Sequence, residues 1–401
     1  MNKSDIYVIV ALTISSLLLL PTFSSASSTP NVSISVKGVL QYPALDPSTP
    51  INKGAVVYGA SSFTAAEISF IASHFTLLSI GFETSTSSLQ GIKSANPNMK
   101  ILGYKDAMGM ATYLDDWTTV NANESWFVHD ASGSRIMMTV FGWYLMDVGN
   151  AGWRQHWVSY VNSKINSYDG VFTDDVWNTI PDWALPNFDK TVPSSVIARW
   201  HTDMMGFLQY AKANLISGKV LFVNSDEFDT NDYLNIADGE MIEGYEHAPW
   251  GSITTFGRPS IDVLARKSAT GKIVWAESGM DTTGVSQTQI DAMLKYCYSS
   301  FLIGMNGAKA YWGWNLGGTY VGSIPNNYQT IMDTSMGQPT GAYYVSQGVY
   351  MRDFTGGKVL FNPSANSHTV SLGGNYQLLN GAVVSSIVLA LWSGEILLSL
   401  T

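Results

Sequence analysis

The chain has 401 residues, of which 46% are hydrophobic and only 13% are charged, so it is long enough for one large domain with a sizeable core and a small second domain. Its net charge is −10 and its lysines and arginines form no cluster, which argues against a nucleic-acid partner. The single cysteine, Cys297, lies in an apolar helical run and excludes a disulfide framework; we expect it to be buried and unreactive.

Residues 1–26 have the features of a secretory signal peptide. An apolar run at residues 6–20 is followed by small residues at positions 24–26, and this run is short for a membrane-spanning helix. We therefore expect a secreted protein, with an uncleaved anchor and cell-surface association as the alternative. Residues 27–53 are rich in Ser, Thr and Pro and predict a linker that contains one possible short strand at residues 32–40.

From residue 54 to residue 335, short apolar runs alternate with helical patterns. We expect strands at residues 55–59, 75–80, 100–104, 171–173, 219–224, 239–243, 272–277 and 308–314. Helices are expected at residues 64–74, 86–95, 151–165, 195–214, 260–268 and 287–303. This alternation predicts an α/β protein with a (β/α)8 TIM barrel.

The barrel pattern is interrupted by a long excursion at about residues 105–149, rich in polar and aromatic side chains. A further strand candidate at residues 143–148 is assigned to this excursion, because counting it in the barrel would give nine strands. We expect the excursion to form a wall of the substrate site. The alternative is an inserted lid that does not contact substrate.

Residues 336–401 have no helical period and alternate in short apolar runs separated by Gly, Asn and Ser. They predict a small antiparallel β-sandwich domain after the barrel. The apolar stretch at residues 382–392 is too short and too interrupted for a membrane segment, so we expect a pair of core strands there.

Polar side chains recur where the predicted barrel strands end. They are Tyr104, Lys105 and Asp106 after the third strand, Asp174 and Asp175 after the fourth, and Asn224, Glu243 and Glu277 after the next three. Buried charges cost several kcal/mol unless they are paired, and the carboxyl ends of barrel strands carry the chemistry of this fold. The pattern therefore predicts a catalytic barrel for a polar, uncharged or cationic ligand.

Hydrolysis of a glycosidic bond needs two carboxyl groups, one with a raised pKa and one ionised. We expect Asp174 to be the nucleophile and Glu243 the acid/base, because the fourth and sixth strands can face one another across the barrel mouth. Alternation along a strand lets at most one of Asp174 and Asp175 point along the axis. Asp175, the first reserve, is expected to brace a neighbouring strand or to cap the next helix. Glu277, the second reserve, is expected to orient a sugar hydroxyl or to pair with Lys105.

The remaining substrate-binding candidates are polar or aromatic. They are Tyr104, Lys105, Asp106, Asp147 and Asn224, together with the possible sugar platforms Trp177, Tyr245, Trp250, Trp312 and Trp314. Core packing is the alternative role for each of the aromatic residues. The six histidines show no metal-ligand spacing, and no phosphate-binding glycine loop is present. We therefore expect neither a metal nor a cofactor.

Several segments together resemble the glycosyl-hydrolase-like family 15. They are WFVHDASGSRI (126–136), YLMDVGNAGWRQHW (144–157), YDGVFTDDV (168–176) and the tail GVYMRDFTGGKVLFNPS (348–364), followed by LGGNY and WSGEILL. That family is similar to other barrel glycosidases, including the endo-α-1,4-polygalactosaminidases, which share a DGVF-x-D motif on the fourth strand. The resemblance implies a barrel hydrolase with Asp174 and Glu243 as the catalytic pair, and a β domain at the C-terminus.

These patterns lead to the hypothesis of a secreted glycoside hydrolase that retains anomeric configuration and cleaves an oligo- or polysaccharide. The alternative is a non-catalytic carbohydrate-binding or cell-surface structural protein on a barrel scaffold. A hydrolase of another bond class, such as a deacetylase, is less well supported. The first two are distinguished by whether Asp174 and Glu243 face one cleft.

Overall fold

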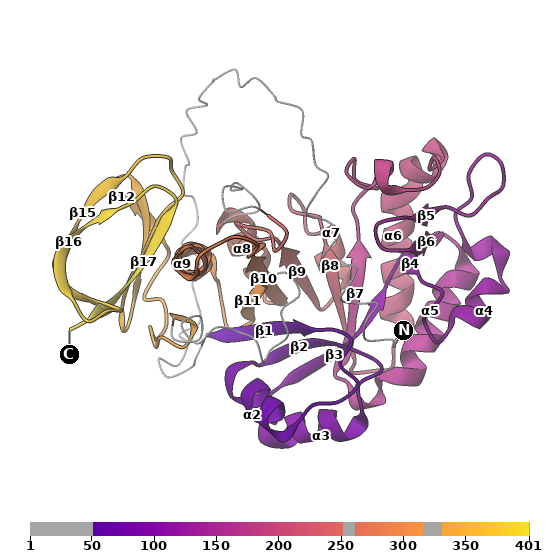
Figure 1. Cartoon of the computed structure of the whole chain (residues 1–401), viewed down its shortest axis with the longest axis horizontal. Helices are drawn as coiled ribbons and strands as arrows, with labels where there is room; N and C mark the ends of the chain where they lie inside the picture. Colours follow the sequence, from indigo (N-terminus) through magenta and orange to yellow (C-terminus); the bar gives the residue numbers. More distant parts are fainter. Residues whose placement is uncertain (1–50, 252–260, 316–330, 401) are drawn as a thin grey trace.

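The computed structural model describes residues 51–251, 261–315 and 331–400. Its centre is a closed barrel of parallel strands in the order β1-β11-β10-β9-β8-β7-β3-β2 (Figure 1). The strands are β1 (Asn52–Val57), β2 (Leu77–Gly81), β3 (Lys100–Asp106), β7 (Gly170–Val176), β8 (Val220–Ser225), β9 (Gly239–Glu243), β10 (Ile273–Gly279) and β11 (Ala310–Asn315). Each overlaps a strand predicted from the sequence, so the (β/α)8 barrel is confirmed. The predicted signal peptide and nearly all of the predicted linker lie outside the described residues.

Helices cover the outside of the barrel (Figure 1). They are α2 (Ala65–His74), α3 (Thr86–Ala95), α5 (Ala151–Lys164), α6 (Ser194–Asn214), α7 (Asp232–Ile236), α8 (Ile261–Ser268) and α9 (Gln287–Gly304), with short 3-10 turns η3 (Ile165–Ser167) and η4 (Leu185–Asn187). Helix α2 begins at a capping box in which the Thr64 side chain and Glu67 satisfy each other's backbone N–H groups. Ser286 and Gln289 start α9 in the same way. Such caps supply acceptors for N–H groups that have no partner within the helix.

Inward-facing apolar side chains fill the barrel interior. The cluster comprises Leu77, Leu102, Phe172, Phe222, Met241, Ile273, Trp275 and Tyr311, which come from seven different strands. The Trp275 indole occupies so much of this space that a Cβ on Gly54 or Gly313 would lie within 2.7 Å or 2.3 Å of it. Glycine is therefore required at both positions for the tryptophan to fit. The packed interior leaves the strand ends as the place where a site can form.

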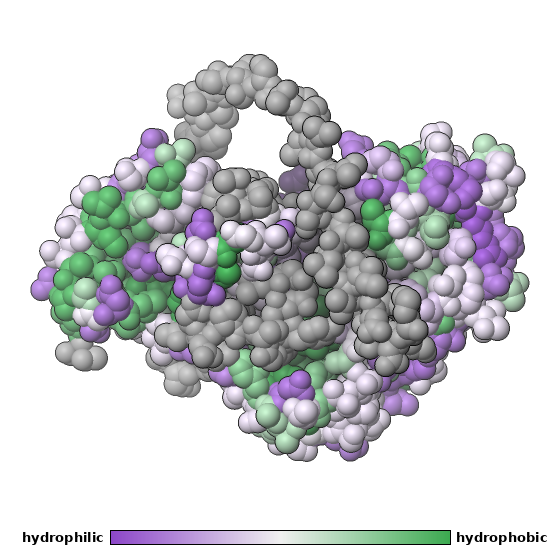
Figure 2. Space-filling model, viewed as in Figure 1, coloured by the Kyte–Doolittle hydropathy of each residue, from purple (hydrophilic) through white to green (hydrophobic). Residues whose placement is uncertain are grey.

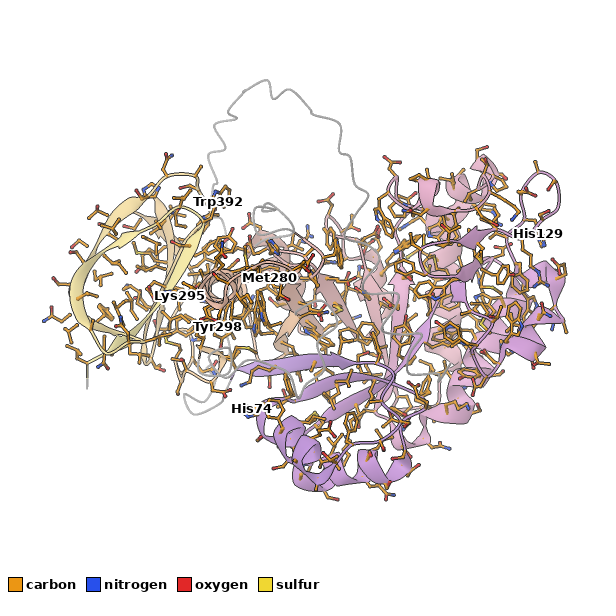
Figure 3. The ribbon with its side chains drawn as sticks, viewed as in Figure 1. His74, His129, Met280, Lys295, Tyr298 and Trp392 are labelled. Atoms are coloured by element: carbon orange, nitrogen blue, oxygen red, sulfur yellow. The ribbon has the colours of Figure 1, made fainter. Side chains whose placement is uncertain are left out.

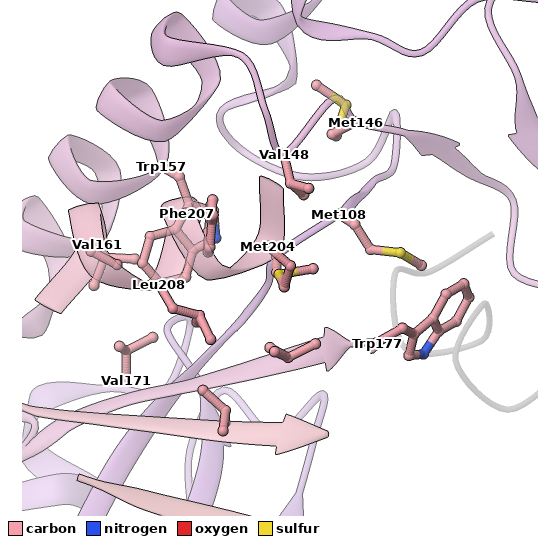
Figure 4. Packing of buried hydrophobic residues seen from close by; sticks show 14 of the residues in the cluster. Met108, Met146, Val148, Trp157, Val161, Val171, Trp177, Met204, Phe207 and Leu208 are labelled. Atoms are coloured by element: carbon pink, nitrogen blue, oxygen red, sulfur yellow. The ribbon is translucent and has the colours of Figure 1, made fainter. Parts of the chain in front are cut away.

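A larger core lies between the barrel and its helices. Figure 4 shows Trp157 of α5 and Phe207 of α6 packed together in this layer, with their rings edge to face at 5.1 Å. The indole N–H of Trp157 donates to the backbone oxygen of Asp106 at 2.8 Å. The buried ring therefore both fills the core and fixes the end of β3.

The excursion after β3 folds as a small lobe of its own. It contains β4 (Gly109–Met110), α4 (Trp117–Asn121), η2 (Glu124–Trp126), β5 (Met137–Met138) and β6 (Trp143–Leu145), and the three strands form a separate antiparallel sheet. The assignment of the strand candidate at residues 143–148 to this excursion is thus confirmed. A buried ion pair between Lys105 and Asp116, at 2.9 Å, fastens the lobe to the outer face of β3. His156 of α5 contacts the same carboxylate at 3.0 Å.

The C-terminal part is a separate antiparallel sheet in the order β12-β13-β14-β17-β15-β16, which agrees with the β domain predicted there. Its strands are β12 (Tyr344–Ser346), β13 (Val349–Phe354), β14 (Gly357–Asn362), β15 (His368–Leu378), β16 (Val383–Leu389) and β17 (Ser393–Ser399). The sheet has a buried cluster of its own, with Val349 and Leu360 at one end of the order and Val370 and Leu389 at the other.

Helix α9 joins the C-terminal sheet to the barrel. Lys295 of α9 pairs with Glu395 of β17 at 2.8 Å, and Figure 3 shows Lys295 beside the sheet. The Tyr296 and Phe361 rings pack across the same boundary with centroids 4.9 Å apart. The buried Arg352 guanidinium of β13 donates to backbone oxygens at the end of α9. The sheet is therefore fixed to the barrel by apolar, ionic and hydrogen-bond contacts.

The outer strand β16 differs from the sequence prediction. Residues 382–392 were expected to form a pair of core strands, but Val383 and Val388 are 55% and 67% exposed. The reason is that β16 lies at the edge of the sheet and pairs with β15 alone. Figure 2 shows hydrophobic surface gathered over this sheet. None of the described helices is long and apolar enough to cross a membrane.

Candidate active site

The candidate site is a layer of polar side chains at the carboxyl ends of the barrel strands. Successive side chains on a strand point to opposite faces, so the residue two positions after an interior residue also points inward. Applied to the interior cluster, this rule brings Tyr104 of β3, Asp174 of β7, Asn224 of β8, Glu243 of β9 and Glu277 of β10 to the barrel mouth. These five residues, all predicted from the sequence, therefore belong to one site.

The Asn224 side chain links the two proposed catalytic carboxylates. Its amide nitrogen donates to Asp174 Oδ1 and to Glu243 Oε2, each at 2.9 Å. Because both oxygens lie 2.9 Å from one nitrogen, their separation cannot exceed twice that distance, about 5.8 Å. Asp174 and Glu243 thus face one another, as the glycosidase hypothesis requires.

The Asp174 carboxylate is held by three donors. Besides Asn224, the Tyr104 hydroxyl donates to Oδ2 at 2.8 Å, and the backbone N–H of Asp175 donates to Oδ1 at 3.0 Å. Burial raises the pKa of Asp174, and the three hydrogen bonds oppose that rise. These donors favour the ionised form, and they fix the orientation of the carboxylate.

Glu277 lies beside Glu243 on the neighbouring strand, because the two residues are paired in the register of β10 and β9. Burial raises the pKa of Glu277 well above its usual value, and the nearby charges of Glu243 and Asp174 raise it further, while a hydrogen bond from Asn315 opposes the shift. These effects shift Glu277 towards its protonated form, in which a carboxyl group can donate a hydrogen bond. Lys105 pairs with Asp116 instead of Glu277, so the predicted Lys105–Glu277 pair is wrong.

Asp106 and Asp175 form a second pair of carboxyl groups at the mouth. Asp106 is paired in register with Asp174 on the adjacent strand, and its carboxyl interacts with that of Asp175. Burial and the charge of Asp174 raise the pKa of Asp106 to about 6. Burial and the charges of Asp106 and Asp174 raise the pKa of Asp175 well above its usual value. This interaction with a residue of β3 agrees with one of the two roles expected of Asp175, bracing a neighbouring strand.

Two site residues were not among the sequence candidates. Tyr58 directly follows β1, two positions after the interior residue Val56, and its ring packs against Tyr104 with centroids 4.5 Å apart. Burial and then the charge of Asp174 raise its pKa well above the usual value. Asn315, at the end of β11, contributes a hydrogen bond to Glu277. Strand alternation could have identified both.

Two polar candidates lie outside the mouth. Lys105 follows the inward-facing Tyr104 and so points to the outer face of β3, where its ammonium also lies 4.3 Å from the centroid of the Tyr160 ring. Asp147 pairs with Arg199 of α6 at 3.0 Å. Both predicted substrate-binding roles are therefore replaced by structural ones, which fasten the excursion to helices α5 and α6.

Most of the aromatic candidates belong to the core. Trp312 and Trp314 alternate with the interior residue Tyr311 and so face outward, where Trp312 packs on Phe301 with centroids 5.5 Å apart. Tyr245 is fully buried and its hydroxyl lies 2.7 Å from the Ser300 hydroxyl. Trp177 is buried in the outer core (Figure 4). Of the predicted sugar platforms only Trp250, 54% exposed, presents a ring to solvent.

No metal site accompanies the carboxyl groups in the described part of the chain. Among those residues, no group of three or more His, Cys, Asp and Glu side chains is arranged to hold a metal ion. The carboxyl groups at the mouth can perform proton transfer and nucleophilic attack.

Comparison with known proteins adds a family and a fold. A family model described as "Hypothetical glycosyl hydrolase family 15" matches residues 93–358. The noncanonic maltogenic alpha-amylase AmyB from Thermotoga neapolitana is 12% identical, with a TM-score of 0.54 over 87% of this chain and 99% of that chain. The glycoside hydrolase domain of PelA from Pseudomonas aeruginosa is 14% identical, with a TM-score of 0.45 over 67% of this chain and 97% of that chain. No curated protein sequence matches the chain. The similarity to AmyB supports the barrel fold.

Proposed function

The chain belongs to the hypothetical glycosyl hydrolase family 15, and from this premise we propose that it hydrolyses O-glycosidic bonds, with Asp174 as nucleophile and Glu243 as acid/base. The observation that carries the proposal is the Asn224 amide bonded to both carboxylates at 2.9 Å. This shared amide supports the proposal, because hydrolysis needs two carboxyl groups that flank one glycosidic bond.

The separation of the two carboxylates favours retention of configuration. Retaining enzymes hold their carboxyl groups about 5–5.5 Å apart, whereas inverting enzymes leave about 6.5–9.5 Å for a water molecule. The nearest oxygens of Asp174 and Glu243 are at most about 5.8 Å apart, which is nearer to the range of retaining enzymes than to that of inverting enzymes. We therefore assign the double-displacement mechanism.

In the first step the Asp174 carboxylate attacks the anomeric carbon while the Glu243 carboxyl gives its proton to the glycosidic oxygen. The bond between that oxygen and the anomeric carbon breaks, and the sugar remains as an ester on Asp174. In the second step the Glu243 carboxylate takes a proton from water, which attacks the anomeric carbon and releases Asp174. Glu277, whose pKa is raised, is the residue that we propose to donate a hydrogen bond to a sugar hydroxyl.

The charge at the mouth indicates which sugars fit. Five carboxyl groups gather there, from Asp106, Asp174, Asp175, Glu243 and Glu277, while Lys105 is turned away. An anionic sugar would be repelled by the ionised members of this group. We therefore propose a neutral or cationic oligo- or polysaccharide as the substrate, with Trp250 as a platform at the rim.

We also propose that the protein is secreted, with retention at the cell surface as the alternative. The support is the apolar run at residues 6–20 followed by small residues at positions 24–26. Fractionation of expressing cells, followed by N-terminal sequencing of the extracellular protein, tests this. A mature chain that begins near residue 27 is the expected result, and a chain that stays intact in the cells contradicts it.

The central test is a hydrolysis assay on a panel of neutral, cationic and anionic glycans. The wild-type protein is compared with Asp174→Asn and Glu243→Gln, and with Asp182→Asn as a matched control, because Asp182 is an exposed aspartate. Release of new reducing ends by wild type and control, but by neither site variant, is expected. NMR of the first product should show the anomeric configuration of the substrate. Binding by all four proteins without release from any glycan would favour a non-catalytic carbohydrate-binding protein.

Tyr104→Phe is expected to shift the acid limb of the activity profile to higher pH, by up to about 1 unit. The nucleophile must be ionised, so activity is lost as pH falls through the raised pKa of Asp174. The Tyr104 hydroxyl lowers that pKa, and its removal raises it. The measurement is kcat/KM against pH for both proteins. An unchanged acid limb would show that Asp174 does not set it.

A further inference from the structure

The backbone at Asp175 departs from the regular conformation of a strand. Asp175 has φ +52°, in the left-handed region that non-glycine residues rarely adopt. The register between β7 and β8 shifts between Thr173 and Val176, as at a β-bulge. The shift interrupts the alternation of side chains at Asp175, which interacts with Asp106 of the neighbouring strand β3. Strain of this kind persists when surrounding contacts hold it in place.

One oxygen of Asp106 is held tightly by the loop that follows β3. Asp106 Oδ1 accepts the backbone N–H groups of Met108 at 2.7 Å and Gly109 at 2.6 Å. A Cβ on Gly109 would lie 2.5 Å from Asp106 Oδ2, so glycine is needed for the loop to wrap this carboxylate. Two backbone donors on one oxygen favour a negative charge on Asp106.

The other oxygen, Asp106 Oδ2, is buried and receives no N–H or hydroxyl group from the described residues. A buried acceptor without a donor costs free energy, and the group that faces Asp106 is the Asp175 carboxyl. Two adjacent carboxylates cannot both ionise cheaply. We propose that Asp106 and Asp175 share one proton, with Asp175 as the donor and Asp106 as the charged acceptor, and that Asp106 thereby acts as a positioning residue beside the nucleophile.

The groups around this pair are acidic or neutral. Asp174 on β7 and Glu243 on β9 face Asp175, and the Tyr104 and Tyr113 hydroxyls lie close enough to be influenced by Asp106. A second charge on the pair would therefore be added next to the ionised Asp174. The shared proton keeps the pair at one negative charge, so that no second charge on the pair opposes the ionisation of Asp174.

The two isosteric substitutions are expected to behave differently. Asp175→Asn replaces the proposed O–H donor by an N–H donor and so imitates the native state. Asp106→Asn instead moves the charge to residue 175, away from the two backbone donors and towards Asp174. If the pair were only a structural contact, both variants would lose stability alike and at every pH.

The first test measures melting temperature against pH and does not depend on activity. The folded protein keeps the Asp175 proton while the unfolded chain releases it, so wild type loses stability as pH rises from the ordinary aspartate pKa through the raised one. Asp175→Asn is free of this loss. We expect its melting temperature to match wild type near pH 4 and to exceed it near pH 8, by on the order of 2 °C. Asp182→Asn is the control and should follow wild type.

Infrared difference spectra at neutral pH detect the protonated carboxyl group directly. The difference between wild type and Asp175→Asn should contain the carbonyl band of one protonated carboxyl group, because bands from other protonated carboxyls are common to both proteins and cancel. A melting temperature lowered equally at every pH in Asp175→Asn, with no such band in the difference, would overturn the shared proton. This test needs only the Asp175→Asn variant. It can therefore be completed even if Asp106→Asn does not fold.

The positioning role rests on the proposed function and is tested with a hydrolysed glycan. Asp106→Asn should lower kcat by about tenfold or more, a larger loss than in Asp175→Asn, and Asp175→Asn should extend the alkaline limb. Equal losses in both variants would overturn the positioning role. A wild-type protein inactive on every glycan would refute the proposed function instead, and the melting and infrared results would still decide whether the proton is shared.

Discussion

Replacing Asp174 by alanine is expected to lower kcat by at least about 10⁴-fold, the scale of loss when a catalytic nucleophile is removed. The substitution deletes the carboxylate that would attack the anomeric carbon. It also leaves the Tyr104 hydroxyl and one Asn224 N–H without their acceptor. Single-turnover and steady-state rates on the glycan that wild type hydrolyses measure this loss.

Azide distinguishes the role of Asp174 from that of Glu243. In Asp174→Ala, azide can enter the space of the missing carboxylate and form a glycosyl azide of inverted configuration. Glu243→Gln is expected to lose about 10²–10⁴-fold, the usual contribution of a general acid, and to regain activity on substrates whose leaving group needs no proton.

Asp182→Ala serves as the control for both variants and should keep wild-type rates. Activity in Asp174→Ala within a hundredfold of wild type, or an azide product of retained configuration, would contradict the assignment of the nucleophile. Far-UV circular dichroism of each variant shows that a loss of rate is not a loss of fold.

The sequence predicted the barrel well because each strand is a short apolar run bounded by helical patterns. The end of each apolar run also shows which polar residues follow the strand. Three of these residues, Asp174, Asn224 and Glu243, meet at the mouth. The sequence did not predict which face of each strand a residue occupies. A parallel strand buried on both sides is apolar throughout, so β11 gave no sign that Tyr311 faces inward and Trp312 outward.

Lys105 and Tyr58 illustrate the same limit. Lys105 stands one position from Tyr104, and only the interior packing of Leu102 shows that the tyrosine, and not the lysine, points inward. Tyr58 ends an apolar run that contains no polar neighbour, so composition gave it no functional signal. Counting outward in steps of two from the interior residues would have corrected both assignments.

The left-handed conformation of Asp175 could not be predicted from the sequence, for a different reason. Aspartate enters the left-handed region more readily than most residues, but the sequence DDV does not specify a bulge. The register shift at this point depends on how β7 pairs with β8, which is a property of the assembled sheet. Contacts between distant segments, such as that of Arg352 with α9, cannot be predicted from local sequence patterns for the same reason.

Replacing Arg352 by methionine is expected to lower the free energy of unfolding by roughly 3–5 kcal/mol, the cost of removing one partner from a buried charged contact. The guanidinium donates to the backbone oxygens of Leu302 at 3.0 Å, Ile303 at 2.9 Å and Met305 at 2.6 Å. These carbonyls end α9, where a helix has no internal donors and carries partial negative charge. Methionine keeps the apolar stem but leaves the buried oxygens without a donor. Chemical denaturation followed by tryptophan fluorescence measures the loss.

Arg135→Met is the matched control, because Arg135 also makes several hydrogen bonds but has the exposed Glu124 as its charged partner. Its loss should stay below about 1 kcal/mol, as is usual for surface ion pairs. Equal losses in the two variants would contradict the argument. Since Arg352 belongs to β13 of the C-terminal sheet and its acceptors belong to the barrel side, a large loss would also show that sheet and barrel unfold as one unit. A separate early transition in Arg352→Met would instead show that the guanidinium is what couples them.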